Sequence, residues 1–483
     1  MTATRFARTA LSATLAFALV ACGGGGSSTP ITSGGSSGGS SGGGQGTSGA
    51  CSLSERQDWA LDVVNEWYLF PDLLASNVNK ASHSDLQSYL NALVAPARAE
   101  NKDRGFTFIT SIEEENALIN SGSSAGFGIR LAYDTSANRV FILESFETAP
   151  GFQAGMDRGS ELLAIGSNSS NIQTVASLMA AGGPQAVVDA LGASDAGVTR
   201  VLRFTTADGS TAEQSVAKTD YALDPISDRY GVQTFNDGGK QVGYINLRTF
   251  IVSDASDQLR TAIGDFRAQG ISEIIIDLRY NGGGLVSVAE VFGDLLGRDD
   301  VGQVYSRTTL RASKASNNET KLFETEANSV NPTKLAFIMT GSSASASELL
   351  ANSMLSYLGN DIALIGSNSF GKPVGQFGFD RSECDDRLRV LTFQTENADG
   401  NAEYFDGLAS AFPNTCRAQD DLFKSFDDPT EDSIAKALDF LGGRTCTAIS
   451  GGTTRTTQSV RPVREPLRPE RPTAAQYEIP GLF

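Results

Sequence analysis

From about residue 232 to residue 445, short apolar runs alternate along the chain with amphipathic segments. Most of the runs lack a polar face, which is typical of strands buried on both sides of a sheet. The segments between them carry apolar residues every three or four positions, as helices that pack on a sheet do. The predicted elements occupy residues 241–250, 254–270, 272–279, 285–296, 334–339, 346–358 and 361–366. This order predicts an α/β layer with helices on both faces of the sheet.

The region before this layer begins with a helical pattern. Trp59, Val63, Val64 and Trp67 recur at helical spacing behind the stretch "SLSE", which fits a capping box. We therefore expect residues 51–112 to form a helical N-terminal region.

The next stretch, residues 113–222, is rich in glycine and poor in helical runs. Its apolar stretches "GFGIRL" (126–131) and "VFILESF" (140–146) have the length and composition of strands. We expect a β-rich insert between the helical region and the α/β layer.

The first fifty residues have the features of a targeting signal and a linker, and not those of a folded domain. Arg5 and Arg8 precede the apolar run "ALSATLAFALVA", which is too short for a stable transmembrane helix. The sequence "LVAC" resembles the lipobox of bacterial lipoproteins, with cleavage before Cys22 and lipid on its thiol; the alternative is an ordinary secretory signal with an incidental cysteine. The Gly/Ser-rich stretch that follows has no core residues and predicts a flexible tether. The resemblance implies a bacterial cell-envelope lipoprotein, and Gly23 favours the outer membrane, facing the periplasm.

The composition of the chain argues against nucleic acids as partners. The chain has 483 residues, of which 40% are hydrophobic, and a formal net charge of −18. Such a chain can bury a sizeable core, but it offers no basic face for nucleic acid.

Residues 449–483 hold five arginines among prolines and almost no core residues, which predicts a disordered tail.

Four cysteines remain once Cys22 is set aside: Cys51, Cys384, Cys416 and Cys446. An even number in an exported chain predicts two disulfides, with three possible connectivities. We favour Cys384–Cys416, which is local to one segment, and Cys51–Cys446, which would join the two ends of the folded body.

Two small-residue turns in the α/β layer carry candidate chemistry. "DLRYNGGGL" (277–285) would leave backbone amides free at a helix start, where an anion is favoured. "TGSSASASELL" (340–350) would place a serine at the carboxyl end of a strand, where α/β sheets bind ligands.

A serine hydroxyl needs a proton acceptor, and the chain has a single histidine, His83, far upstream. The candidate base is Lys372 in "FGKPVGQ", which follows the next strand and would return to the same edge of the sheet. Its pKa would have to fall from about 10.4 to roughly 7–8, a shift that burial away from carboxylates can produce.

These motifs resemble known families. "APGFQAGMDRGSELLAIGSN" (149–168) is similar to a passage of PDZ domains, which implies that Gly126, Phe127, Gly128 and Ile129 form a loop that binds a peptide carboxylate. The order "DLRxNGGG", "SASASE", "FGKxxxQ" resembles the carboxyl-terminal (tail-specific) processing proteases of the S41 class. The resemblance implies a multi-domain α/β protein with an S41 core of the crotonase-like ClpP type.

The S41 resemblance also implies roles for individual residues. Ser345 falls on the nucleophile, Lys372 on the general base and Gln376 on the residue that positions the lysine.

The oxyanion donors fall on the amides of Ala346 and Gly284, with Gly283 as the neighbouring candidate. Two departures are Pro373, where the family usually has glycine, and a serine–lysine separation about two residues longer than the common pattern.

The expected function is therefore hydrolysis of envelope proteins or peptides that carry unstructured apolar C-termini. Neither a cofactor nor a metal is expected, and an adaptor lipoprotein is a further expected partner. The alternatives are a non-catalytic lipoprotein that binds peptides or apolar ligands on the same fold, and an esterase or amidase for small substrates. The chain's own end, "IPGLF", is itself of the kind that a PDZ groove accepts, so weak self-engagement is expected.

The expected division of the chain is 1–21 signal peptide, 22–50 tether, 51–112 helical region, 113–222 PDZ-like domain, 223–448 protease core and 449–483 tail.

Overall fold

The computed structural model describes residues 51–206, 209–449 and 464–483. The expected signal peptide, the tether, the lipidated Cys22 and residues 450–463 of the expected tail lie outside the described residues. In the described part of the chain, no helix is both long and apolar enough to cross a membrane.

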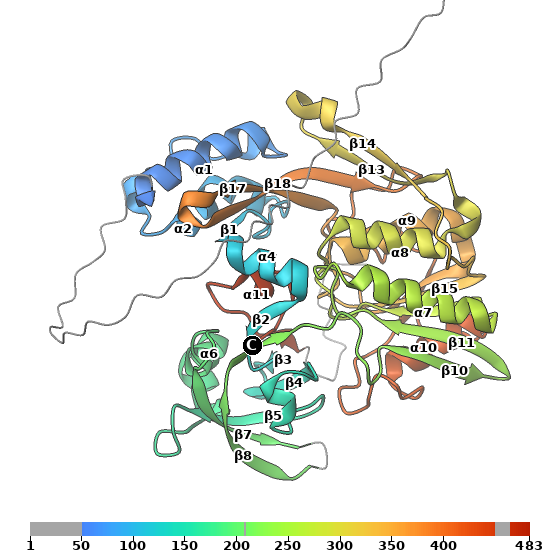
Figure 1. The fold of residues 1–483 in the computed structure, drawn as a ribbon, viewed down its shortest axis with the longest axis horizontal. Coiled ribbons are helices and arrows are strands. Elements are labelled where there is room, and N and C mark those ends of the chain that lie inside the picture. Colours follow the sequence, from blue (N-terminus) through green and yellow to red (C-terminus); the bar gives the residue numbers. More distant parts are fainter. Residues whose placement is uncertain (1–50, 207–208, 450–463) are drawn as a thin grey trace, which may run out of the picture. The chain divides into compact units, whose positions relative to one another are not determined.

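A six-stranded sheet forms the centre of the α/β layer, in the order β10-β11-β12-β15-β16-β19 (Figure 1). All neighbouring strands are parallel except β10 and β11, which form an antiparallel hairpin. The strands are β10 (Val232–Asp237), β11 (Lys240–Asn246), β12 (Glu273–Asp277), β15 (Lys334–Met339), β16 (Ile362–Gly366) and β19 (Asn414–Arg417).

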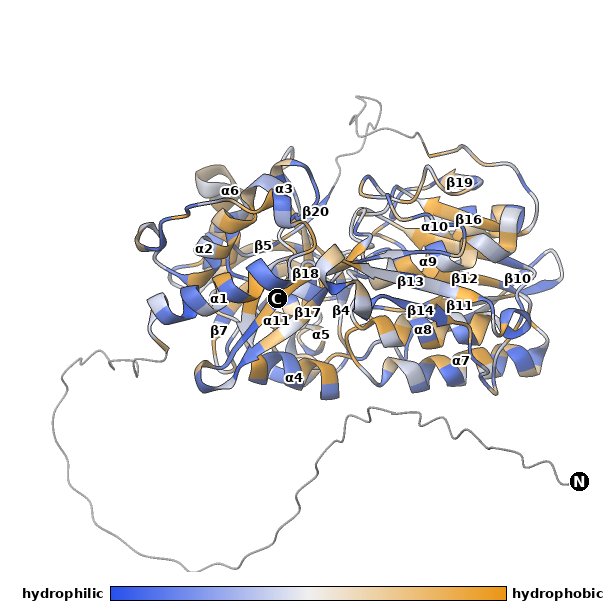
Figure 2. Ribbon diagram, turned by 90° about the horizontal axis from the view of Figure 1, so that it is seen from above, coloured by the Kyte–Doolittle hydropathy of each residue, from blue (hydrophilic) through white to orange (hydrophobic). Residues whose placement is uncertain are grey.

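Helices cover both faces of this sheet, as the apolar runs predict. On one face, Ile274 and Ile276 of β12 join the core formed with α7 (Ala255–Gln269), α8 (Val286–Leu296) and α9 (Ala346–Leu358). The intervening Ile275 points to the other face and packs with α10 (Asp432–Leu441). Figure 2 shows apolar and polar residues on opposite sides of α7 and α8, which is why these helices pack on the sheet.

A second sheet, in the order β1-β18-β13-β14 with β17 paired to β18, carries the N-terminal helices. Tyr68 and Leu90 from the helical region pack against Leu391 of this sheet in one buried cluster. The elements are β1 (Phe108–Ser111), β13 (Val304–Leu310), β14 (Glu319–Leu322), β17 (Val374–Arg381) and β18 (Asp386–Glu396), with α1 (Leu53–Trp67), α2 (Leu86–Leu93) and α3 (Ala95–Ala99).

The β-rich insert forms a third sheet, in the order β20-β3-β4-β5-β7-β8, with β6 paired to β5 and α6 packed on β5. A short pair, β2 with β9, joins it to the rest of the chain. The elements are β2 (Ser123–Gly126), β3 (Ile129–Asp134), β4 (Arg139–Ser145), β5 (Glu161–Gly166), β6 (Gln173–Thr174), β7 (Thr199–Thr205), β8 (Thr211–Ala217), β9 (Thr219–Ala222) and β20 (Glu465–Pro466), with α4 (Ile112–Ser121), α5 (Pro150–Gln153) and α6 (Val175–Leu191).

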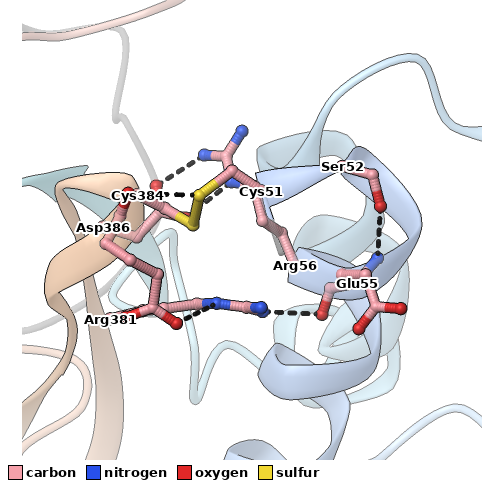
Figure 3. Close-up of a disulfide and its surroundings, with 8 residues drawn as sticks. Cys51, Ser52, Glu55, Arg56, Arg381, Cys384 and Asp386 are labelled. Atoms are coloured by element: carbon pink, nitrogen blue, oxygen red, sulfur yellow. Dashed lines mark hydrogen bonds and ion pairs between the residues drawn. A yellow bond between two sulfur atoms is a disulfide. The ribbon is translucent and has the colours of Figure 1, made fainter. Parts of the chain in front are cut away.

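The four cysteines form two disulfides, but the expected pairing is wrong. The bonds are Cys51–Cys384, over 333 residues, and Cys416–Cys446, over 30. Cys51 precedes α1, which packs on the second sheet beside the turn that holds Cys384, and Arg56 of this helix pairs with Asp386 there (Figure 3). Cys446 follows α10, which lies against β19 and Cys416. Tertiary packing therefore selects the connectivity, and sequence separation does not.

The expectation of a disordered tail is wrong for residues 464–483. They form β20 and α11 (Ala474–Glu478), and the apolar side chains of Leu467, Ile479, Leu482 and Phe483 are buried. The composition of this segment is poor in core residues, but the few that it has pack on apolar residues of the β-rich insert and of the α/β layer.

Candidate active site

Three loops meet at the carboxyl edge of the central sheet. β12 leads into the glycine loop, residues 282–284. β15 leads into residues 340–345, which carry Ser345 and are called the serine turn, and β16 leads into residues 367–373, which carry Lys372 and are called the lysine loop. Because β12, β15 and β16 are adjacent and parallel, their ends come together, as the sequence predicts.

Ser345 occupies a strained turn at the start of α9. Its φ of 57° and ψ of −116° are unusual for a residue with a side chain, and Ala346 is the first residue of the helix. Such backbone strain costs about 1–3 kcal/mol and is typical of functional turns. The geometry resembles a nucleophile elbow, in which a sharp strand-to-helix turn exposes the serine hydroxyl.

Glu348 ties the serine turn to the lysine loop. Its Oε2 accepts hydrogen bonds from the amides of Ser345 (3.1 Å) and Lys372 (2.7 Å), and its Oε1 accepts from the amide of Gly371 (2.7 Å). Burial raises the pKa of the Glu348 carboxyl, and hydrogen bonds from Ser369 and the three amides oppose this effect. The two predicted catalytic residues are thus anchored to one oxygen atom, and Arg104 holds the same loop through the carbonyl of Gly371.

Lys372 is half-buried and pairs with Gln376. Its Nζ donates to Gln376 Oε1 over 3.1 Å, and Gln376 Nε2 donates to the carbonyl of Phe106 over 2.9 Å. The Phe106 ring centroid lies 4.8 Å from Nζ. Burial lowers the pKa of Lys372, whereas the carboxylates of Glu478, Asp103 and Glu348 oppose that shift. Among the described residues, no hydrogen bond joins Lys372 Nζ to Ser345 Oγ.

The glycine loop lies against Ser345. A Cβ placed on Gly283 would be 2.7 Å from the Cβ of Ser345, so only glycine permits this approach. The amide of Gly283 donates to Asn281 Oδ1 over 2.9 Å, which leaves Gly284 as the better oxyanion donor of the two. The other predicted donor, the amide of Ala346, lies in the first turn of α9, where amides lack intrahelical acceptors.

Two positioning residues, Glu348 and Asn281, were not predicted. Asn281 accepts hydrogen bonds at its carbonyl from the amide of Ala344 (3.1 Å) and from the hydroxyl of Ser347 (2.9 Å), so it joins the glycine loop to the serine turn. The spacing Ser-x-x-Glu at the start of a predicted helix is a capping-box signal, and it could have identified Glu348.

The predicted peptide loop lies at the start of β3. Gly126 ends β2, Phe127 is fully buried, Gly128 has a φ of 66°, and Ile129 begins β3. A Cβ on Gly128 would lie 2.0 Å from that of Ala149, so the turn requires glycine. The amide of Ile129 donates to the terminal oxygen of the chain, that of Phe483, over 3.2 Å.

Buried ion pairs join the β-rich insert to the α/β layer. Arg248 pairs with Glu144 (2.8 Å) and Glu147 (2.9 Å), and Arg158 pairs with Asp420 (2.5 Å). Arg130 of β3 donates to the carbonyl of Tyr280, next to the glycine loop. The insert is therefore held against the candidate site by ion pairs whose arginines are almost fully removed from solvent.

A cavity of about 540 Å³ opens over the site. From the α/β layer and the second sheet it is lined by Gly282, Ser342, Ala344, Lys372 and Gln376, among others. Residues 464–483 supply a further wall, which includes Arg468, Pro472, Tyr477, Glu478 and Pro480.

A strained serine, a partly buried lysine and helix-start amides thus lie together at one edge of a parallel sheet in an α/β core. Residues 241–409 match the model described as Peptidase family S41, so the chain carries a domain of this family. The chain is 26% identical over 300 residues to carboxyl-terminal-processing peptidase 3, chloroplastic, of Arabidopsis thaliana, covering 60% of this chain and 52% of that protein. It is 24% identical over 287 residues to a carboxyl-terminal-processing protease of Synechocystis sp., covering 58% and 61%.

The chain thus spans about half the length of the curated relatives that it matches. A solved structure of an S41 protease from Bacteroides fragilis shares the fold, with a TM-score of 0.61, 20% identity and coverage of 80% of this chain and 97% of that one. The predicted fold class is confirmed.

Proposed function

We propose that the chain is a serine endopeptidase with a Ser345–Lys372 dyad. The observation that supports it most strongly is the anchoring of both residues by Glu348, at the edge where three parallel strands end. A lone serine turn would not require a partly buried lysine with a lowered pKa on the adjacent loop.

The proposed reaction follows from these positions. Ser345 Oγ attacks the carbonyl carbon of a peptide bond while neutral Lys372 Nζ accepts its proton. The carbonyl electrons move to oxygen, which the amides of Ala346 and Gly284 stabilise. The C–N bond then breaks, and the lysine returns the proton to the leaving amine. Water attacks the acyl-enzyme with Lys372 as base, and Ser345 recovers its hydrogen as the acid product leaves.

We further propose that the β-rich insert acts as a PDZ domain for substrates with apolar C-termini. A peptide would add as a strand to β3, with its carboxylate at the loop of Gly126, Phe127, Gly128 and Ile129. The edge of β3 away from β4 already accepts an added strand, β20 and residues near the end of the chain, and Phe127 is buried beneath the loop; both observations support this assignment.

The location that we propose is the bacterial cell envelope, with a lipid anchor on Cys22 in the outer membrane, facing the periplasm. The two disulfides favour an oxidising compartment. Mass spectrometry of the mature N-terminus should find an acylated cysteine, and an unmodified start at another residue would contradict the anchor. An adaptor lipoprotein remains a predicted partner.

Digestion of casein by the wild type, Ser345→Ala and Lys372→Ala tests the protease assignment. We expect each substitution to lower the rate by about 10³-fold or more, because the nucleophile and its base act as a unit. Phe423→Ala, which changes a side chain that is 68% exposed and outside the site, is the control. Equal cleavage by Ser345→Ala would sink the assignment.

A further inference from the structure

The last twenty residues return to the candidate site and pair with the edge of β3. Glu465 and Pro466 of β20 pair with Tyr133 and Ala132 of β3, and the end of the chain pairs further along the same edge. Figure 1 shows the C-terminus beside β2 and β3. We call residues 464–483 the C-terminal segment.

Phe483 lies where the carboxylate of a peptide ligand would lie. Its amide donates to the carbonyl of Ile129 over 2.9 Å, and its terminal oxygen accepts from the amide of Ile129 over 3.2 Å. Its side chain is 3% exposed and packs with Phe127 and Met156 in the core of the insert. A Cβ on Gly126 would lie 3.0 Å from the carboxyl carbon of Phe483, so the loop approaches the chain end closely. This arrangement is strand addition to the edge of β3.

The same segment also covers the glycine loop. A Cβ on Gly282 would lie 2.6 Å from the carbonyl oxygen of Glu478 and 3.0 Å from the ring of Pro480. Tyr477 stacks on Phe108 with ring centroids 3.8 Å apart, and Glu478 lines the same cavity as Lys372. A substrate chain that ran from β3 to Ser345 would need the volume that these residues fill.

The segment crosses the site as a short helix and turn, and not as an extended strand. α11 begins with a capping box between Thr473 and Gln476, and the amide of Ile479 donates to the carbonyl of Ala475 over 2.8 Å. Gln476 Nε2 also donates to the carbonyl of Leu482 over 2.9 Å. The carbonyls of Ala475 and Leu482 thus accept hydrogen bonds within a compact turn, whereas strand addition presents a substrate in an extended form.

We propose that the C-terminal segment is an inhibitor carried on the chain, which occupies the peptide groove along the edge of β3 and covers the glycine loop. The inference rests on the proposed protease function. An inhibitor on the same chain competes at an effective concentration on the order of millimolar. The enzyme is therefore closed until a substrate or partner with an apolar C-terminus displaces the segment.

Binding of a labelled peptide tests the occupancy of the groove without relying on catalysis. The probe is fluorescein-YEIPGLF with a free carboxylate, and every protein carries Ser345→Ala so that the probe stays intact. We expect Phe483→Asp, and a chain that ends at Pro472, to bind the probe at least tenfold more tightly than the full chain. The amidated probe should bind at least tenfold more weakly than the free acid. Equal affinity of the full and shortened chains, or no binding by either, would overturn the proposal.

Activity gives the second readout, with Ser345 intact. We expect Phe483→Asp and the shortened chain to cleave casein at least tenfold faster than the full chain. Phe423→Asp makes the same chemical change at an exposed phenylalanine and should match the full chain. Ser345-dependent cleavage at one rate in all chains would overturn the inhibitor. No cleavage by any chain, with the binding difference intact, would instead refute the protease function and leave the occupied groove standing.

Discussion

Lys372 Nζ donates a hydrogen bond to Gln376 Oε1 over 3.1 Å, and the other end of the same amide donates to the carbonyl of Phe106. Both ends of the Gln376 amide are therefore engaged, which fixes the orientation of its oxygen towards the lysine. This contact orients the predicted base without adding a charge to it.

Gln376→Glu should move the activity profile to higher pH. Burial lowers the pKa of Lys372, and the base acts when it is neutral, so activity rises as the pH rises through that pKa. A carboxylate in place of the amide favours the ammonium form and should raise the pKa of Lys372. The measurement is kcat/KM against pH. Gln376→Ala should lower the rate without this alkaline shift, and an unshifted profile for Gln376→Glu would contradict the assigned base.

Glu348→Gln should lower kcat by about 10²-fold with a smaller effect on folding, because misplacement of reacting groups by about 1 Å has that cost. A glutamine has one acceptor oxygen, so it cannot hold the amides of Gly371, Ser345 and Lys372 as the carboxylate does. Steady-state kinetics and a thermal melt together measure the two effects. Glu113→Gln, at an exposed position on α4, is the matched control. Unchanged kcat in a folded Glu348→Gln protein would refute the positioning role.

Gly283→Ala should abolish most activity while the chain still folds. The new methyl would lie 2.7 Å from the Cβ of Ser345, and the φ of 111° disfavours any residue with a side chain. We expect kcat to fall by about 10²-fold or more, as when an oxyanion donor is lost. Gly270→Ala also places alanine at a positive φ but meets no neighbour, so it separates backbone strain from displacement of the serine. Equal activity of the two variants would refute the close-approach argument.

Glu147→Gln should make the stability of the chain less sensitive to acid. Burial acts to raise the pKa of Glu147, but hydrogen bonds and charge from Arg248 outweigh it and lower that pKa to about 2, from 4.5. A lowered carboxyl pKa contributes stability that is present above pH 4.5 and is lost as the pH falls towards 2. The shift corresponds to at most about 3 kcal/mol, reduced by the partial exposure of the side chain.

Thermal melts between pH 2 and 6 measure this contribution. The wild type should lose more of its stability in that window than Glu147→Gln does. Parallel curves for the two proteins would show that the Arg248 pair does not link the insert's stability to pH.

The sequence alone was sufficient for the fold class and for most element bounds in the α/β layer. The run "KLAFIM" and the segment "ASELLANSMLSYL" coincide with β15 and α9. Periodicity succeeds there because burial on a sheet imposes a fixed spacing of apolar residues, whatever the neighbours are. The convergence of Ser345 and Lys372 also followed from the sequence, since parallel neighbouring strands end at one edge.

Three features could not be read from the chain. Glu348 lies within a predicted motif, but its bond to the amide of Lys372 spans a loop whose path depends on packing. The disulfides follow contacts of α1 and α10 with distant strands, which no local spacing encodes.

The C-terminal segment separates the two kinds of information most clearly. Its sequence determined an apolar terminus of the type that a groove can bind, and its composition argued for disorder, because average composition measures how much core a segment can build by itself. The tertiary structure decided the outcome by providing the core from elsewhere: the edge of β3 supplies hydrogen-bond partners, and Phe127 with Met156 supplies the apolar contacts that bury Phe483. Local patterns thus determine elements and candidate chemistry, whereas contacts between distant segments decide pairing, positioning and occupancy, because their free energy depends on surfaces that exist only after folding.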